Sequence, residues 1–318
     1  MGEENLWQGI SYYDWKNLAA VRAKLDAGAD PDGGPFWMPP LHMAAEVGSA
    51  EVVAEVVARV RDVDQVFDGR TALWRAVHEA KADSAQVLLA AGADPLRPMM
   101  SGWSPARLSL TTPHVIPSAE TLTAAEWDAT AECGRLVTAL KHFPHFDGFS
   151  VACVAGIDAA EVARRLNAEV VPAADVPAEV PMGDWYPSPF GEATERAVSV
   201  TEVPGGCILF QPWYFNVQTP VVMSLLSAGT VVYGMYANPK SGNQGSTYRD
   251  GEYVGSDLHP GGGPNDGGDT AEVLLEHLYA HKAVAYCCAY AGVRPKNDKA
   301  FTEPDQWLIL PDRDYWRA

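Results

Sequence analysis

The stretches “PPLHMAAEVGSAEVVAEVV” (residues 39–57) and “TALWRAVHEAKADSAQVLL” (residues 71–89) decide how the first half of this chain folds. An offset of 32 residues aligns them and places Leu41 over Leu73, with small apolar residues matching further along. Self-similarity at this period predicts stacked helical units that bury their apolar faces only against their neighbours.

The ends of the repeated helices carry residues that suit helix ends. The tetrapeptide “GADP” begins at Gly28 and recurs at Gly92, two periods later. Glycine ends a helix well because it adopts the left-handed conformation at little cost. Thr71 and Ser104 are predicted to cap the first turns of two further helices.

These segments resemble ankyrin repeats. “PPLHMAAEV” is similar to the family's T-P-L-H-x-A-A helix start, and “LDAGADPD” and “LLAAGADP” are similar to its helix end and glycine turn. The resemblance covers about residues 12–110 and implies a short helical stack, which we place at residues 10–145. “DWKNLAAVRAKLDAGAD” is expected to form an incomplete first unit, and the Pro/Thr/Ser-rich residues 111–123 an inserted loop.

The resemblance implies that the residues just before each first helix form a loop tip, beside a groove that commonly binds proteins. Aromatic side chains and methionines exposed together have the composition of an interaction hot spot. The predicted partner-binding residues are Phe36, Trp37, Met38, Phe67, Arg70, Met100 and Trp103. An alternative stays open, in which these loop tips fold back onto the chain's own C-terminal half and are hidden.

The second half of the chain, from about residue 146, has no such period. “FSVACVAGI” predicts a strand, “DAAEVARRLNA” a helix capped by Asp158, and the turns “PGG” and “DG” two hairpins. A single last helix is expected over residues 269–293. This order predicts an α+β domain at residues 146–318 with a mainly antiparallel sheet covered by helices.

Part of this half also resembles a known family. The segments “VACVAGIDAAEVARRLNA”, “SVTEVPGGCILFQPWYFNVQTPVVMSLLSAGT” and “AYAGVRP” are similar to a domain of unknown function common in actinobacterial proteins. The resemblance covers roughly residues 146–297. It implies a fold and brings no established chemistry.

The net charge of the chain limits the classes of molecule that we expect it to bind. The chain of 318 residues has 23 basic and 41 acidic residues, a formal net charge of −18, and residues 1–145 alone hold 12 basic and 19 acidic residues. Nucleic-acid phosphates and anionic lipids attract the opposite sign, so neither is an expected partner. An acidic surface suits a basic protein partner, or serves solubility alone.

Cysteine usage and hydropathy indicate a cytoplasmic protein. The five cysteines are too few and too scattered for a secreted disulfide framework, and no CxxC pair indicates a zinc site. The start “MGEENLWQGI” has no basic segment followed by an apolar run, and no apolar run approaches the roughly 20 residues that cross a bilayer. No export signal or anchor is therefore expected.

Two motifs have features of a ligand site, but each is better explained without a ligand. His277, His281 and Cys288 have the spacing of one helix stripe, which makes them weak metal candidates. A packed helix face is the alternative that we favour. “HPGGGPNDGGDT” at residues 259–270 lacks the lysine and the spacing of a phosphate-binding loop, so a linker is expected and no cofactor is predicted.

Aromatic residues cluster in two segments of the second half. Such side chains can wall a pocket for a flat organic ligand, or they can seal a loop over a small core. The pocket hypothesis names Trp185, Tyr186, Phe190, Trp213, Tyr214 and Phe215.

The function that we expect is a protein-binding adaptor or regulator, and in a narrower form an antidote that neutralises a basic partner. The alternative is an enzyme or small-molecule-binding protein of secondary metabolism that uses the aromatic pocket. No catalytic triad can be assigned because the histidines follow no motif. The sequence therefore leans against an enzyme, and it predicts no oligomeric state.

Overall fold

The chain divides into two compact units, seen in a computed structural model that describes residues 6–33, 38–143, 147–176, 190–261 and 268–317. The first unit comprises residues 1–128 and 264–278, and the second comprises residues 129–263 and 279–318. The first unit thus ends before the boundary expected at residue 145. It also takes up a segment of the C-terminal half, because that segment packs on the helical stack.

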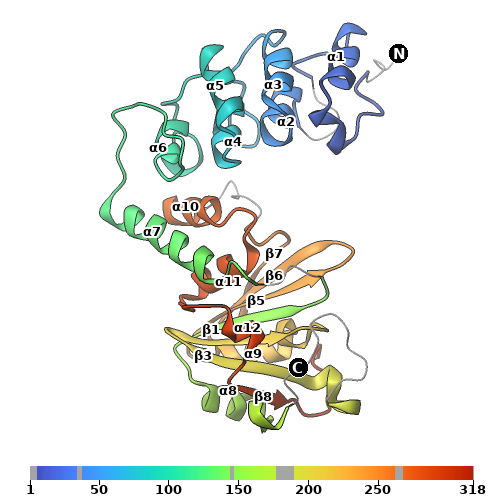
Figure 1. Ribbon diagram of the computed structural model, residues 1–318, viewed down its shortest axis with the longest axis vertical. Coiled ribbons are helices and arrows are strands. Elements are labelled where there is room, and N and C mark those ends of the chain that lie inside the picture. The colour runs from blue at the N-terminus through green and yellow to red at the C-terminus, as the bar shows by residue number, and fades with distance from the viewer. Residues whose placement is uncertain (1–5, 34–37, 144–146, 177–189, 262–267, 318) are drawn as a thin grey trace. The chain divides into compact units, whose positions relative to one another are not determined.

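The first unit is a stack of short helices in two layers (Figure 1). One layer contains η1 (Tyr12–Lys16), α2 (Pro40–Val47), α4 (Ala72–His78) and α6 (Pro105–Ser109). The other contains α1 (Leu18–Asp26), α3 (Ala50–Val57) and α5 (Ala82–Ala90). Helix pairs that repeat along one direction confirm the predicted stack, since each pair buries its apolar face against the next.

The predicted helix ends are confirmed. Thr71 Oγ1 accepts a hydrogen bond from the Trp74 amide at 3.2 Å, and Ser104 caps α6 in the same way. Gly28 and Gly92 follow helix ends with φ of 94° and 93°. These local signals fix where each helix begins and ends, so that the repeated leucines fall in the core.

The repeat pattern is lost after α6. Residues 110–123, all of which the structure describes, contain no helix or strand, and a loop was expected there. The longer helix α7 (Ala124–Ala139) follows and continues past the division between the two units. The remaining elements of the first unit are η2 (Met100–Gly102) and α10 (Thr270–Leu278).

The second unit is built on an eight-stranded sheet in the order β2-β8-β3-β4-β1-β5-β6-β7. Every neighbouring pair is antiparallel, as expected for an α+β domain. The strands are β1 (Ser150–Ala155), β2 (Glu169–Pro172), β3 (Ala197–Val203), β4 (Gly206–Gln211), β5 (Val231–Asn238), β6 (Gly242–Arg249), β7 (Glu252–Asp257) and β8 (Gln306–Ile309).

Helices cover both faces of the sheet because alternate side chains of the central strands are apolar on both sides. Ala152 and Val154 of β1 pack in the core beneath α8 (Ala159–Leu166) and α9 (Pro220–Ser227). Cys153 points the other way, with its Sγ 3.7 Å from Cys288 Sγ of α11. The helices of this unit also include α11 (Ala283–Ala291), α12 (Lys299–Thr302) and the short η3 (Ala173–Asp175), η4 (Gly191–Arg196) and η5 (Asn216–Gln218).

Two expectations about this half are corrected. The β3–β4 and β6–β7 hairpins form as predicted, but β2 and β8 were missed. The helix expected over residues 269–293 is broken into α10 and α11, because His281 takes a left-handed φ of 60° between them. Every helix in the described residues is too short or too polar to cross a membrane.

Candidate functional site

The loop tip before α4 is a tight hairpin. The Phe67 amide donates to the Arg70 carbonyl at 2.9 Å, and the Arg70 amide donates back at 3.2 Å. Asp68 and Gly69 between them have φ of 53° and 68°, the positive values of a two-residue hairpin turn. The Arg70 guanidinium is held by Asp68 at 2.6 Å and lies over the Trp74 ring at 5.8 Å.

A buried arginine ties this tip to the preceding repeat. Arg75 Nε donates to His42 Nδ1 at 3.1 Å, its Nη1 contacts Glu46 at 2.6 Å, and its Nη2 donates to the Phe67 carbonyl at 3.3 Å. His42 Nε2 therefore carries the proton and donates to the Gln65 carbonyl at 3.0 Å. Burial, and then the Arg75 charge, lower the pKa of His42 to about 4.

The structure separates the predicted partner-binding residues into three groups. Met38, Phe67 and Arg70 are half-buried. Met100 and Trp103 are buried, with 6 % and 0 % of their surfaces exposed. Phe36 and Trp37 lie outside the described residues. The expectation of exposed side chains is wrong for Met100 and Trp103.

The last loop tip is hidden because the chain's own α10 segment covers it. Trp103 Nε1 donates to the Thr270 carbonyl at 3.0 Å, and Thr270 Oγ1 donates to the Ser101 carbonyl at 3.2 Å. The Ser101 hydroxyl also donates to the Gly268 carbonyl. In this repeat the loop tip therefore packs against a segment from the C-terminal half of the chain, which is the second of the two arrangements considered for the tips.

His277 fixes the other end of α10 on the stack. Its Nδ1 lies 3.1 Å from Nδ1 of His78, and its Nε2 lies 2.9 Å from Oγ1 of Thr111. His78 is the last residue of α4, and Thr111 follows α6 at the equivalent position one repeat later. The His78 ring also stacks on Trp74 at 5.1 Å between ring centroids. The helix α10 thus lies along the first helices of the last two repeats.

The metal hypothesis for His277, His281 and Cys288 does not hold. The break at His281 ends the expected helix stripe, and it leaves His277 in the first unit and the other two residues in the second. Among the described residues, no group of three histidine, cysteine or acidic side chains is arranged to hold a metal ion.

The N-terminal end of the same layer carries exposed aromatic side chains. Tyr12 and Tyr13 of η1 are 50 % and 80 % exposed, and their rings meet edge to face at 5.8 Å. Partial burial, followed by the carboxylates of Glu46 and Glu79, raises the pKa of Tyr12. Glu46 and Glu79 lie one repeat apart at the ends of α2 and α4. We call these four residues the tyrosine–glutamate face; the sequence analysis missed it.

Of the six aromatic residues in the pocket hypothesis, the four that the structure describes pack against other side chains. Trp213 is 2 % exposed, donates from Nε1 to the Thr194 carbonyl at 2.8 Å and stacks on Trp307 at 6.0 Å. Phe190 packs on the same Trp307 ring at 5.0 Å. These side chains seal a small core, which is the alternative considered for them.

Tyr214 and Phe215 of the pocket hypothesis also contact neighbouring side chains. Tyr214 donates to Glu195 Oε1 at 2.7 Å, which together with burial raises its pKa to about 12. Phe215 packs against Tyr236 and Trp316, each at 5.7 Å between ring centroids. Trp185 and Tyr186 lie outside the described residues.

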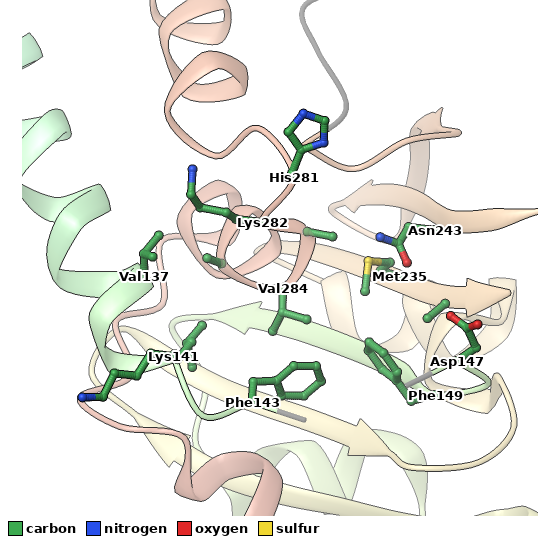
Figure 2. A pocket seen from close by; sticks show the side chains of 14 residues that line it. Val137, Lys141, Phe143, Asp147, Phe149, Met235, Asn243, His281, Lys282 and Val284 are labelled. Atoms are coloured by element: carbon green, nitrogen blue, oxygen red, sulfur yellow. The ribbon is translucent and has the colours of Figure 1, made fainter. Parts of the chain in front are cut away.

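A cavity of about 500 Å³ lies elsewhere in the second unit (Figure 2). Its walls come from the end of α7, the chain around β1, the β5–β6 hairpin and the start of α11. Phe190, Trp213, Tyr214 and Phe215, the described residues of the pocket hypothesis, do not line it. The lining residues are Val137, Leu140, Lys141, Phe143, Asp147, Phe149, Met235, Ala237, Asn243, His281, Lys282, Ala283, Val284 and Ala285.

The cysteines are buried and unbridged. Burial raises the pKa of Cys207 to about 12, and it also raises the pKa values of Cys133, Cys153 and Cys287. The raised pKa values of these four thiols disfavour the thiolate that a cysteine nucleophile needs.

Comparison with known families identifies one repeat. Residues 68–98 match the family model of the ankyrin repeat. This segment runs from the loop tip at Asp68 through α4 and α5, so the N-terminal half of the chain contains an ankyrin repeat. No curated protein matches the chain. Ankyrin repeats suggest binding to protein partners, and the resemblance expected for residues 146–297 stays a prediction.

Proposed function

We propose that this protein is a protein-binding adaptor or regulator that recognises its partner through the tyrosine–glutamate face. The observation that carries the proposal is the ankyrin repeat at residues 68–98, in a stack whose N-terminal end bears exposed tyrosines. Tyrosine supplies a large contact area with few side-chain torsions to restrict, and it is enriched among residues that dominate interface energies.

The chemistry of this face suits a basic partner. Tyrosine rings attract lysine and arginine side chains through their π faces, and the Glu79 carboxylate lies near Tyr12, while Glu46 is already paired with Arg75. The charge of −18 on the whole chain would also speed the encounter with a cationic protein. In the narrower form of the proposal, the protein is an antidote that neutralises a basic partner.

The last repeats contribute less to the proposed interface. Because α10 lies on Trp103, Ser101 and His78, a partner meets this segment rather than the loop tip beneath it. The proposed interface therefore includes Tyr12, Tyr13, Glu46, Glu79 and the hairpin at Phe67–Arg70. It leaves out Met100 and Trp103.

The test is a pull-down from a lysate of the source organism with the intact chain and with Tyr12→Ser/Tyr13→Ser. Trp127→Ser is the matched control, because Trp127 is also exposed, at 51 %, but lies on α7 away from the proposed face. We expect one stoichiometric protein that the control retains and the tyrosine variant loses. A partner held equally by all three chains would disprove the role of this face, and no partner for the intact chain would count against the adaptor.

With a partner identified in this way, the contribution of charge to binding can be measured. Exposed ionic contacts weaken as salt rises, because a Debye length falls from about 10 Å at 0.1 M to about 3 Å at 1 M. We expect Glu79→Lys to reduce the association rate with the isolated partner and to flatten its dependence on salt. An unchanged rate would leave the adaptor in place but would argue against a basic partner.

A further inference from the structure

Helix α10 is fixed on the last two repeats by polar contacts at both of its ends. At its N-terminal end, the Thr270 carbonyl accepts a hydrogen bond from Trp103 Nε1. At its other end, His277 lies between His78 and Thr111, and the two histidines are only 7 % and 8 % exposed. Histidine is the side chain whose ordinary pKa lies between pH 5 and 8, so the protons in this contact decide how it behaves in acid.

The hydrogen bonds around His277 determine which of its nitrogens carries the proton. The Thr111 hydroxyl has one hydrogen, which it donates to the Leu108 carbonyl at 2.8 Å. Thr111 Oγ1 therefore accepts from Nε2 of His277, 2.9 Å away. A neutral imidazole carries one proton, so Nδ1 of His277 is an acceptor. Nδ1 of His78, at 3.1 Å, is consequently the donor between the two neutral rings.

This pair of histidines can take up one proton without losing the contact between the rings. The added proton binds Nε2 of His78, 3.9 Å from Oε1 of Glu79, and the Nδ1–H group of His78 still points at His277. A second added proton must bind Nδ1 of His277, which faces a nitrogen that already carries one. Two N–H groups and two positive charges then meet at 3.1 Å in a buried place, where little solvent screens their repulsion.

Titratable side chains come from each helix near the pair. Glu79 follows α4 directly, and Glu276 precedes the histidine of α10. Tyr12 of η1 and Lys81 of the turn after α4 lie within electrostatic reach of Glu79. On the side of α6, the contact is the hydroxyl of Thr111, which does not titrate in this range. The carboxylates favour the first added proton, but they do not remove the clash that the second one creates.

We propose that α10 is an acid-released cover of the last repeat, held while the His78–His277 pair carries at most one added proton and freed when the pair takes up a second. Trp103 is 0 % exposed in the closed state, and Met100 belongs to η2, which packs on the same helix. Release exposes both side chains. The tip of the last repeat thus has a closed state at neutral pH and an open state in acid.

The number of protons sets the size of the effect. The open state binds two added protons on the pair and the closed state binds one, so opening is coupled to the uptake of one proton. With an ordinary histidine pKa of about 6.5, the opening equilibrium constant rises about tenfold at pH 5.5 and about thirtyfold at pH 5.0, relative to pH 7.5. The closed state is therefore fully favoured above about pH 6.5 and is lost progressively below it.

Amide hydrogen exchange of the full-length chain, corrected for the intrinsic exchange rate at each pH, tests the proposal. We expect the protection of Thr270–Leu278 to fall about tenfold from pH 7.5 to pH 5.5 in the unaltered chain. His78→Asn keeps an amide that can donate or accept in place of Nδ1 and does not titrate, so its α10 should keep nearly constant protection. His114→Gln, at an exposed histidine after α6, is the matched control and should behave like the unaltered chain.

Helix α3 reports on the stability of the whole unit, so its pH dependence should be the same in all three chains. The same pH dependence of α10 in the unaltered chain and in His78→Asn would overturn the proposal.

Nitrogen NMR of the imidazole rings tests the proton positions directly in the unaltered chain. At pH 7.5, we expect Nδ1 of His277 to have the chemical shift of an unprotonated nitrogen and Nδ1 of His78 that of a protonated one. The protection of α10 should be lost over the pH range in which both rings become charged. Two charged rings under an α10 that stays protected would overturn the proposal, and this measurement decides the question if His78→Asn fails to hold α10 at pH 7.5.

Discussion

His78 and His277 are 199 residues apart in the chain, yet their Nδ1 atoms lie 3.1 Å apart in the first unit. One of the two rings must donate in this contact, while Nε2 of His277 faces the hydroxyl of Thr111 at 2.9 Å. The pair joins α10 to the ends of α4 and α6. It explains why a segment of the C-terminal half belongs to the helical stack.

Removal of the His277 ring should loosen α10. His277→Ala leaves His78 and Thr111 without this partner in a buried place, which costs about 1–3 kcal/mol. We expect faster amide hydrogen exchange in α10 and at Trp103, whose indole donates to Thr270. His114→Ala, at an exposed histidine of the loop after α6, is the control. Equal protection of α10 in both variants would show that the histidine contact does not hold it.

Alanine substitutions at two aromatic residues of the first unit should distinguish a side chain that stabilises the fold from one that is available for recognition. Trp103 is fully buried, and its replacement by alanine should destabilise this unit by about 3–5 kcal/mol. Tyr13 is 80 % exposed, so Tyr13→Ala should change the unfolding free energy by less than about 0.5 kcal/mol. Denaturant titrations of both variants measure the two values. A large loss at Tyr13 would mean that this side chain serves packing rather than recognition.

The sequence predicted the fold well wherever local signals determine it. The leucines of the repeat, the caps at Thr71 and Ser104 and the hairpin turns all act within a few residues, and each is found where it was expected. The sequence does not predict strand β8, because Gln306–Ile309 is only four residues long and forms a strand through its pairing with β2 and β3. The break at His281 was missed because nothing in its side chain requires a positive φ.

The candidate sites were harder to predict because they depend on contacts between distant segments. Trp103 has the composition of a hot spot, but α10 buries it from a position more than 160 residues further along the chain. Trp213 and Phe190 meet on Trp307, which the aromatic clusters near residues 185–215 did not include. The two tyrosines of η1 were detectable in principle as adjacent aromatics just before the first helix.

Acid should weaken the first unit through His42. Its folded pKa of about 4 lies below the ordinary value of about 6.5, so the unfolded chain takes up the proton more readily. The contribution of the neutral His42 ring to the unfolding free energy is fully present above pH 6.5. It is lost as the pH falls towards 4, and the total loss is about 3 kcal/mol. Unfolding free energies measured across this range should decline less in His42→Gln. The same decline in both chains would assign the acid sensitivity to other groups.

Two glycines should respond to alanine in opposite directions. Gly206 begins β4 with φ of 150°, and an added Cβ would lie 2.0 Å from the Val154 carbonyl oxygen. Neither the φ nor the neighbouring strand can adjust without breaking the pairing of β1 with β4, so Gly206→Ala should destabilise the second unit by more than about 2 kcal/mol. Thermal unfolding of the full chain measures this loss.

Gly134 is the opposite case, because it is exposed within α7 and an added Cβ would have no heavy atom within 4 Å. Alanine is favoured over glycine in a helix interior by roughly 0.5–1 kcal/mol, in part because a glycine residue has more conformations in the unfolded chain and loses more entropy on folding. Gly134→Ala should therefore raise the unfolding temperature while Gly206→Ala lowers it. A loss of stability at Gly134 would mean that α7 bends or packs there in a way that only glycine allows.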